Sequence, residues 1–344
     1  MESTVRTVQE VSTTPTTSTR PQLNRKSSSL DSTTLEQPPN KRTTPQKPST
    51  EPKRPVRFLI LSDTHDTDDD EEDQASAFQT PTISSPVDVV VHCGDLTPHG
   101  TPASLSEAIS KLAAIPAQLR LIIAGNHEIT LDEPYYLSLG GTTTTHAAAT
   151  KAIKQDAAAQ GVTHLAEGTH TFTLANGATF TVYASPYTPQ FGASAFQYPT
   201  AEDRFNPATT TPAWATNTAT PASTVPEGVD IVVTHGPSKY VLDDTGNGGS
   251  SGGCEHLRRA ICRARPRMHC FGHDDDEEEG DDGMTCLPRE FVGANQARQR
   301  GYARLCPGSE EALREKRQTP MVNAAIVDDE GKATNAPWLV KLEF

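Results

Sequence analysis

Five short groups of residue types that bind metal ions follow apolar runs along the chain. Carboxylate, amide and imidazole groups occur together in them, and such a mixed oxygen and nitrogen set favours Mn²⁺, Fe or Zn²⁺ over Ca²⁺. One group alone is a weak indication, because Asp and Gly end strands in many proteins. Their recurrence in series predicts a metal site. The groups are Asp63-Thr64-His65, Gly94-Asp95, Gly125-Asn126-His127, Thr234-His235 and Gly272-His273.

The residue types in these groups suit a site for two divalent cations. Two cations about 3.5–4 Å apart need a bridging anionic ligand, and the two carboxylate oxygens of Asp95 can bind both. Asp63 and His65 alternate on an extended segment, so their side chains point to one side and can reach one ion. The neutral residues that remain for the second ion are Asn126, His235 and His273. Each residue taken alone could instead be a buried core histidine or a residue that forms a turn. That interpretation does not explain why all of them follow apolar runs.

The apolar runs before these groups have the length and composition of buried strands. Residues 56–61, 87–92 and 119–124 each end in a turn with Gly, Asp or Asn, and residues 104–114 carry apolar side chains at helical spacing. This order predicts a β-α-β unit with parallel strands, whose carboxyl ends collect ligands at one edge of the sheet. Further along, the sequence predicts a helix near 145–160, a hairpin at 169–184, buried strands at 230–234 and 268–271, and closing strands at 321–327 and 338–344.

Composition divides the 344-residue chain into a tail and one elaborated domain. Residues 1–55 are rich in Ser, Thr, Pro, Gln and Arg and have no aromatic residue, so they are predicted to be disordered. Residues 56–344 form the predicted domain, with loop insertions at about 66–86, 204–228 and 274–320. Acidic runs in the first and third insertions hold 15 of the 44 acidic residues, and the remaining 29 balance the 30 Lys and Arg. The net charge of −14 therefore belongs to local segments and not to a uniformly acidic surface.

The cysteines and the hydropathy of the chain bear on its compartment. The six cysteines are scattered, without a C-x-x-C pair or a dense framework, which is typical of reduced thiols. No segment approaches the roughly 18 apolar residues of a membrane span, and the N-terminus lacks the apolar region of a secretion signal. We therefore expect a cytoplasmic protein, with a nuclear one as the alternative, and no membrane partner.

The groups, in this order, resemble the motifs of the calcineurin-like metallophosphoesterase superfamily. That pattern is D-x-H, then G-D, G-N-H-[ED], a distant G-H or T-H, and finally G-H-x-H. Residues 183–199 and 252–257 are also similar to a branch of metallophosphoesterase-domain proteins known from animal brain and from many fungi. The matching motifs in this chain are SDTHD (62–66), HCGDLT (92–97), AGNHE (124–128), VTHGP (233–237) and FGH (271–273).

The resemblance implies an α/β fold, a four-layer αββα sandwich with a dimetal site at its crest, and attack of a metal-bridging hydroxide on phosphorus. It implies that His127 lies near the leaving oxygen as a general acid or charge stabiliser, with Asp95 orienting it. The implied cofactors are two divalent ions, with Mn²⁺ favoured and Fe, Zn²⁺ or Mg²⁺ as alternatives. The implied ligands are Asp63 and His65 for the first metal, Asp95 as the bridge, and Asn126, His235 and His273 for the second.

The sequence departs from the pattern two residues after His273, where the family has another histidine ligand of the first metal and this chain has Asp275. Asp275 could bind through a carboxylate oxygen, which would make the first site more Mn²⁺- or Mg²⁺-like. It could equally belong to a solvated acidic loop, or the loop could be an insertion that leaves another group to complete the site. We expect a first metal site weaker than the second and an activity below that of full-pattern enzymes. Two equally tight metals by calorimetry, unchanged in Asp275→Ala, would contradict this.

The residues and the resemblance together predict an enzyme that hydrolyses a phosphodiester. Cyclic nucleotides are the first substrates to test, because the resembled branch is linked to that activity. A phosphoprotein phosphatase is an alternative, although the motif regions lack an Arg pair to clamp a phosphomonoester. A weakly active or non-catalytic binding protein with the same fold is another, and Asp275 is the residue that favours it. The expected partner is a small phosphodiester and not long nucleic acid, since no basic cluster adjoins the motifs.

Overall fold

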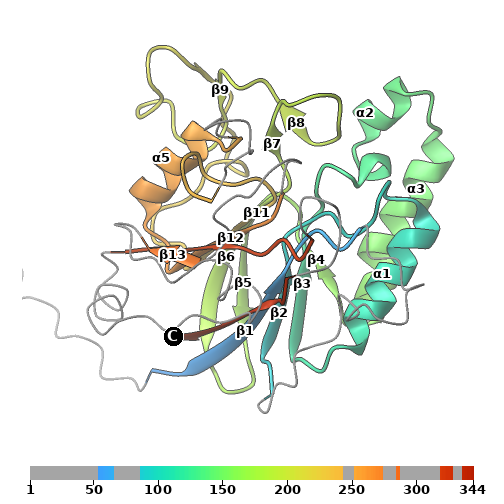
Figure 1. Cartoon of the computed structure of the whole chain (residues 1–344), viewed down its shortest axis with the longest axis horizontal. Helices are drawn as coiled ribbons and strands as arrows, with labels where there is room; N and C mark the ends of the chain where they lie inside the picture. The colour runs from blue at the N-terminus through green and yellow to red at the C-terminus, as the bar shows by residue number, and fades with distance from the viewer. Residues whose placement is uncertain (1–52, 66–85, 243–251, 274–283, 287–317, 328–334) are drawn as a thin grey trace, which may run out of the picture. The chain divides into compact units, whose positions relative to one another are not determined.

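The computed structural model describes residues 53–65, 86–242, 252–273, 284–286, 318–327 and 335–344 (Figure 1). All of these residues belong to the unit that runs from Pro52 to Phe344. The predicted disordered tail up to residue 52, most of the two acidic insertions, and Asp275 lie outside the described residues. Their structure and roles therefore stay predictions.

The strands that come directly before the first three motifs belong to a five-stranded sheet. Its strand order is β15-β1-β2-β3-β4, in which β1 to β4 are parallel and β15 is antiparallel to β1. All residues of β2 are buried, as expected of a parallel strand that is covered on both faces. The strands are Pro55–Leu61 (β1), Val89–His92 (β2), Leu119–Ile122 (β3), Thr163–His164 (β4) and Trp338–Glu343 (β15).

The strands that come directly before the last two motifs, β11 and β12, belong to a six-stranded sheet. Its order is β13-β14-β12-β11-β6-β5, with β5 antiparallel to β6 and β13 antiparallel to β14. The predicted β5–β6 hairpin is confirmed, and its turn uses Gly177 at a φ of 78°, which glycine adopts without steric cost. The strands are Gly168–Thr173 (β5), Thr179–Ser185 (β6), Ile231–Thr234 (β11), Met268–Phe271 (β12), Met284–Cys286 (β13) and Pro320–Asn323 (β14).

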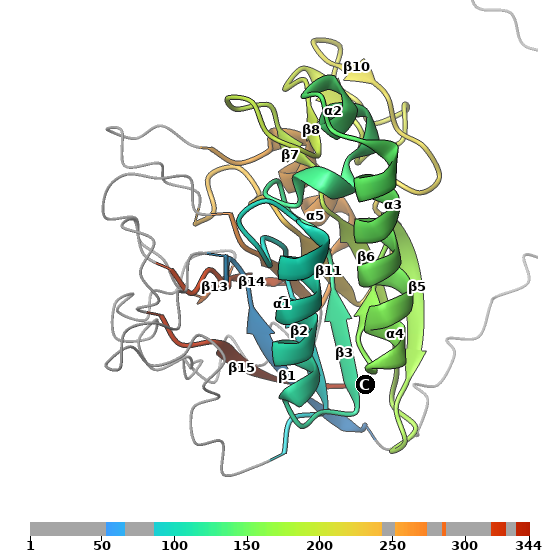
Figure 2. The same ribbon diagram turned by 90° about the vertical axis from the view of Figure 1, so that its right-hand side faces the viewer.

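Buried apolar side chains define four layers. The core between the sheets joins Phe58 and Ile60 of β1 to Phe180 and Val182 of β6. A second core lies between the outer face of the first sheet and helices α1 and α3, and a third lies between the outer face of the second sheet and α5. Helices α1 and α3 lie together on the right-hand side of Figure 1, and this side faces the viewer in Figure 2. The predicted αββα sandwich is thus confirmed. The helices are Pro102–Ala114 (α1), Thr143–Lys151 (α3) and Glu255–Ala264 (α5).

Helix α1 shows how local sequence builds the β-α-β unit. The hydroxyl of Thr101 caps its first turn by accepting a hydrogen bond from the amide of Ser104 at 3.2 Å. Leu105, Ile109 and Leu112 lie on one face and are fully buried against the first sheet. The helix predicted over residues 104–114 is confirmed, and it connects β2 to β3 so that these strands run parallel.

Shorter elements occupy the connections. Residues 204–228, predicted as a loop insertion, contribute Phe205 and Val225 to the third core, where both are fully buried. Among the described residues, no helix is long and apolar enough to cross a bilayer. The short elements are η1 (Ile129–Leu131), α2 (Glu133–Ser138), the π-helical turn η2 (Ala152–Asp156), α4 (Ala157–Ala159), β7 (Thr188–Pro189), β8 (Gln197–Tyr198), β9 (Glu202–Asp203) and β10 (Thr216–Asn217).

Candidate metal centre

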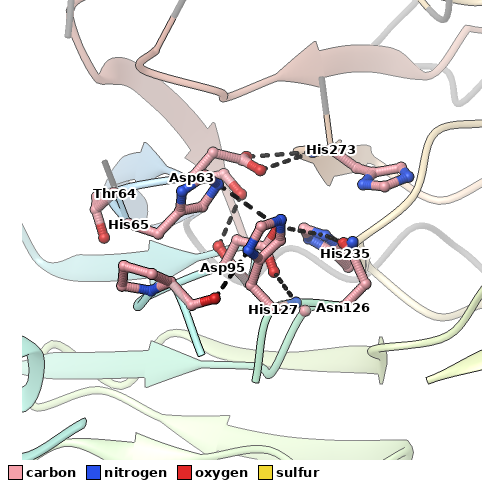
Figure 3. A network of polar contacts seen from close by, with 12 residues as sticks. Asp63, Thr64, His65, Asp95, Asn126, His127, His235 and His273 are labelled. Atoms are coloured by element: carbon pink, nitrogen blue, oxygen red, sulfur yellow. Dashed lines mark hydrogen bonds and ion pairs between the residues drawn. The ribbon is translucent and has the colours of Figure 1, made fainter. Parts of the chain in front are cut away.

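Seven of the predicted site residues meet at one edge of the two sheets (Figure 3). They follow β1, β2, β3, β11 and β12, which run parallel within each sheet and end at this edge. Contacts cross between the sheets: for example, Nδ1 of His235 lies 3.0 Å from the carbonyl oxygen of Cys93, and the amide of His273 donates to the carboxylate of Asp63 at 3.2 Å. The seven residues are Asp63, His65, Asp95, Asn126, His127, His235 and His273.

The backbone is left-handed at three of these residues. Asp63, Asp95 and His273 have φ angles of 57°, 52° and 60°, a conformation that costs a non-glycine residue about 1–2 kcal/mol. Hydrogen bonds between neighbouring turns hold it, from the amide of Asp63 to the oxygen of Gly94 at 3.1 Å and from the amide of Thr64 to the oxygen of Asp95 at 2.9 Å. Residues in this conformation cluster at functional sites, and Asp adopts it more readily than most residue types.

One group of potential ligands matches the predicted second metal site. Asp95, His235 and His273 each offer a ligand atom, and these atoms lie within 4.8 Å of one another. Oδ2 of Asp95 is 3.1 Å and Oδ1 of Asn126 is 2.6 Å from Nε2 of His235. Ligands that bind one ion at about 2.0–2.2 Å lie about 3 Å apart at adjacent positions. The donor set therefore fits a divalent ion.

A second group shares Asp95 with the first and consists of His65, Asp95 and His127. Nε2 of His65 is 3.9 Å from Oδ2 of Asp95, and the rings of His65 and His127 stack with centroids 4.3 Å apart. This group differs from the predicted first site, in which Asp63 is a ligand and His127 is not. Asp63 is buried nearby, and both of its carboxylate oxygens accept the amide of His273. A carboxylate shared by two groups is what two adjacent ions require.

Buried carboxylates that face histidines set the charge of the centre. Burial alone would raise the pKa of Asp95, but the charges of His235, His127 and His65 lower that pKa well below its usual range. Burial alone would lower the pKa of His235, yet Asp95 and Asp63 raise it to about 10. Burial also raises the pKa of Asp63. Without a metal ion, the positive charge opposite Asp95 is therefore a proton on His235, and a metal ion would replace it.

We expect the affinity for Mn²⁺ to rise with pH, by about a hundredfold between pH 6.5 and 8.5. Nδ1 of His235 donates to the carbonyl oxygen of Cys93, so Nε2 is the atom that must lose its proton to bind an ion. Since the pKa of His235 is about 10, each pH unit below it strengthens the competing proton about tenfold. Calorimetry in buffers of different ionisation enthalpy measures both the affinity and the released proton.

The same pKa has the opposite consequence for the metal-free protein. A histidine whose folded pKa exceeds its unfolded value stabilises the fold fully below the unfolded pKa of 6.5, and the contribution is lost as pH rises through about 10. We therefore expect the chelated protein to unfold at a lower temperature at pH 9.5 than at pH 7. An Mn²⁺ affinity that does not change with pH would contradict a ligand role for His235.

Glu128 is a buried residue for which the sequence motifs predict no role. Its carboxylate accepts hydrogen bonds from the amides of Asp95 (3.1 Å), Thr97 (3.0 Å) and Gly125 (2.7 Å), and from the hydroxyl of Thr97 (3.2 Å). These donors belong to the turns after β2 and β3, so Glu128 fixes the turns that carry Asp95 and Asn126 relative to one another. The third motif shows an acidic residue at this position. Its role could not be predicted from the sequence, because the groups that donate to it are mainly backbone amides.

Ser194 is a second residue of the centre that was not predicted from the sequence. Its hydroxyl donates to the carbonyl oxygen of Asn126 at 2.9 Å and accepts from Nδ2 of Asn126 at 3.2 Å. These contacts orient the amide so that its Oδ1 faces His235. Ser194 lies 68 positions later in the chain, between β7 and β8, and no motif marks it.

Gly125 packs so closely against the centre that alanine does not fit. A Cβ at this position would lie 2.2 Å from Oδ1 of Asp95 and 2.7 Å from Cε1 of His235. We expect Gly125→Ala to displace both ligands and to lower Mn²⁺ affinity by at least about tenfold, which metal analysis after dialysis measures. The control is Gly228→Ala, because Gly228 has open space around it at a φ of 79°. That variant should lose about 1 kcal/mol of stability and keep its metal, and equal metal loss in both variants would contradict the prediction.

Comparisons with known proteins agree with this geometry. The sequence model of the family described as calcineurin-like phosphoesterase matches residues 56–275. Metallophosphoesterase domain-containing protein 1 of Homo sapiens and of Mus musculus is in each case 29% identical over 245 residues, which are 69% of this chain and 66% of that protein. A protein of Emericella nidulans named "Probable rhamnogalacturonate lyase C" is 32% identical over 220 residues, which are 63% of this chain and 17% of that protein.

The chain thus spans less than two thirds of the length of these relatives, and only 17% of the fungal one. The family match covers more than half of the chain and includes every residue of both ligand groups. The resemblance drawn from the motifs is therefore confirmed. The protein belongs to the calcineurin-like phosphoesterase family.

Proposed function

We propose that the protein hydrolyses phosphodiesters, with cyclic nucleotides among its substrates, and that it uses two divalent cations, preferentially Mn²⁺. The observation that carries the proposal is the carboxylate of Asp95, which belongs to both ligand groups. Two bound cations would supply Lewis-acid charge neutralisation and an activated water nucleophile. The mixture of carboxylate, amide and imidazole donors supports Mn²⁺ over Ca²⁺.

The charges around the centre support a diester rather than a monoester substrate. Asp95 pairs with His65 and His235. In the part of the chain that the structure describes, no Lys or Arg side chain pairs with Asp63 or Asp95. A phosphomonoester dianion is commonly clamped by Arg, whereas a diester carries a single negative charge and needs less compensation. This favours the diester over the phosphoprotein alternative.

We assign to His127 the transfer of a proton to the leaving group. Its Nδ1 lies 3.0 Å from the carbonyl oxygen of Pro98 and donates to it, which leaves Nε2 for the substrate. Its amide donates to Oδ1 of Asp95 at 2.9 Å. Asp95 thus positions the turn of His127 through the backbone. Proton donation in the transition state contributes about 10²–10⁴ in rate.

The test of the proposal is an assay of the purified protein with Mn²⁺ on three substrates. They are bis(p-nitrophenyl) phosphate, p-nitrophenyl phosphate and cyclic AMP. We expect both diesters to be hydrolysed faster than the monoester and all turnover to stop with chelator. Turnover of the monoester alone would support a phosphoprotein phosphatase, and absence of metal-dependent turnover would support a binding protein that retains the fold.

The proposal extends to the first metal site and to the compartment. A first site weaker than the second, predicted from Asp275, is tested by calorimetry on Asp275→Ala. We place the protein in the cytoplasm, with a small phosphodiester as its partner and without a membrane or long nucleic acid. Free thiols at four described cysteines support a reducing compartment, and they are Cys93, Cys254, Cys262 and Cys270.

A further inference from the structure

Two fully buried histidines lie behind the ligand turns, one in each sheet, and neither belongs to the ligand groups described above. His92 is the last residue of β2, and His269 is the second residue of β12. The residues on either side of each histidine belong to the core between the sheets, so both imidazole rings point to the outer faces of their sheets. These neighbours are Val91, Cys93, Met268 and Cys270. A polar ring in such a place costs free energy unless hydrogen bonds satisfy it.

The hydrogen bonds of His92 connect the turns of the first two motifs. The hydroxyl of Thr64 donates to the carbonyl oxygen of Leu96 at 3.3 Å, so it accepts from Nε2 of His92, which lies 3.1 Å away. Nδ1 of His92 accepts the amide of Gly94 at 3.3 Å. Only the neutral ring with its proton on Nε2 satisfies both contacts. Thr64 stands between the two predicted ligands of the first metal, and Gly94 and Leu96 flank Asp95, so this ring holds both turns together.

His269 repeats this arrangement in the second sheet. The hydroxyl of Thr234 donates to the carbonyl oxygen of Gly236 at 2.7 Å, so it accepts from Nε2 of His269, which lies 2.8 Å away. The hydroxyl of Ser238 lies 3.4 Å from Nδ1 of His269 and can donate to it. Thr234 comes directly before His235, and β12 leads to the other histidine of the second ligand group. The ring of His269 therefore connects the two segments that carry these ligands.

Neither ring is available to bind an ion itself. Both nitrogens of each ring are engaged within the fold, and burial lowers the pKa of His92 and of His269 to about 3. The residues two positions away on the same faces, Val90 and Phe271, are apolar and pack into the outer cores. An apolar side chain would therefore fill each place without a ring to satisfy. What distinguishes the two histidines is their hydrogen bonds to the ligand turns.

We infer that His92 and His269 are positioning residues of the metal centre, each of which orients the ligands of one ion through the hydroxyl of a threonine. His92 acts on the first ion through Thr64, and His269 acts on the second ion through Thr234. The inference rests on the proposed function and gives each of its two ions a separate support. Groups that orient metal ligands in this way typically change the metal affinity by about 10–100-fold.

The test removes one threonine hydroxyl at a time and measures Mn²⁺ binding by calorimetry. His65→Ala leaves the second ligand group intact. In that protein, Thr234→Val should weaken the remaining ion at least about tenfold, while Thr64→Val should leave its affinity within about twofold. In protein with His273→Ala, which leaves the first group intact, the two results should be exchanged. Thr64→Ser and Thr234→Ser retain the hydroxyl and should retain the affinity.

Thr181→Val is the matched control, because it also removes a hydrogen-bonded hydroxyl from a sheet. The hydroxyl of Thr181 donates to Oδ2 of Asp230 at 3.0 Å, at the opposite end of β11 from the ligand turn. This variant should unfold at a lower urea concentration and keep both Mn²⁺ affinities. If Thr64→Val and Thr234→Val behave in the same way, the histidines have only a structural role and the inference is overturned. Equal weakening of the same ion by both variants would also overturn it.

A measurement on the unchanged, metal-free protein decides the matter if a variant does not fold. Nitrogen NMR of the imidazole rings identifies which nitrogen carries the proton. We expect His92 and His269 both to carry it on Nε2, and a proton on Nδ1 of either ring would overturn the inference. Absence of Mn²⁺ binding in the unchanged protein would instead count against the proposed function, and the tautomers then decide the inference alone.

Discussion

Asn in place of Asp95 is expected to lower kcat/KM for phosphodiester hydrolysis by at least about a thousandfold, or about 4 kcal/mol of transition-state stabilisation. Oδ2 of Asp95 lies 3.1 Å from Nε2 of His235 and 3.9 Å from Nε2 of His65, so one carboxylate serves both ligand groups. An amide has nearly the same shape but no charge, and its nitrogen does not bind a cation. The variant should therefore fold and lose both the bridge between the ions and the anion that holds them.

Metal analysis and the rate with Mn²⁺ on bis(p-nitrophenyl) phosphate measure this effect. The control is Asp230→Asn, because Asp230 precedes β11 while His235 follows it, and its Oδ2 accepts the amide and the hydroxyl of Thr181 at 3.0 Å. The control also neutralises a hydrogen-bonded carboxylate, at the opposite end of the same strand, and should keep its metal and activity. A variant at Asp95 that retains a tenth of the activity would contradict a bridging role.

Much of the fold and the place of the site followed from the order of apolar runs. The runs 56–61 and 87–92 contain most of β1 and all of β2, and residues 104–114 lie in α1, because buried strands and amphipathic helices have distinct apolar periods. Parallel strands end at one edge of a sheet, so motifs that follow such strands must converge. The convergence of Asp63, Asp95 and Asn126 therefore needed no knowledge of any tertiary contact.

Features that depend on contacts between distant segments were not predictable in this way. Ser194 reaches Asn126 from a loop that no motif marks. Within residues 204–228, average composition indicates a solvated loop, yet Phe205 and Val225 are fully buried. These two apolar side chains, together with hydrogen bonds such as that from Nδ2 of Asn206 to the carbonyl oxygen of His256 at 2.8 Å, hold the segment, and an average over its composition conceals them. The grouping of His127 with His65 and Asp95 likewise depends on the side-chain positions that the folded turns impose.

His127→Ala is expected to lower the hydrolysis of cyclic AMP by about 10²–10³-fold, and that of bis(p-nitrophenyl) phosphate by less than about tenfold. The ribose alkoxide that leaves cyclic AMP is strongly basic and needs a proton, whereas p-nitrophenolate is stable without one. His127 can supply this proton from Nε2, because its Nδ1 donates to the carbonyl oxygen of Pro98. His170→Ala is the control, since His170 lies half-buried on β5 and belongs to neither ligand group.

The comparison also decides between the two roles that the geometry offers His127. As a general acid, its loss affects substrates in proportion to the basicity of the leaving group and leaves the bound metal in place. As a ligand, in the group with His65 and Asp95, its loss removes metal and slows both substrates equally. Metal content measured beside the two rates separates these outcomes. If both substrates slow equally and one metal ion is lost, His127 is a ligand of the first metal. It would then take the ligand role that the sequence motifs predict for Asp63.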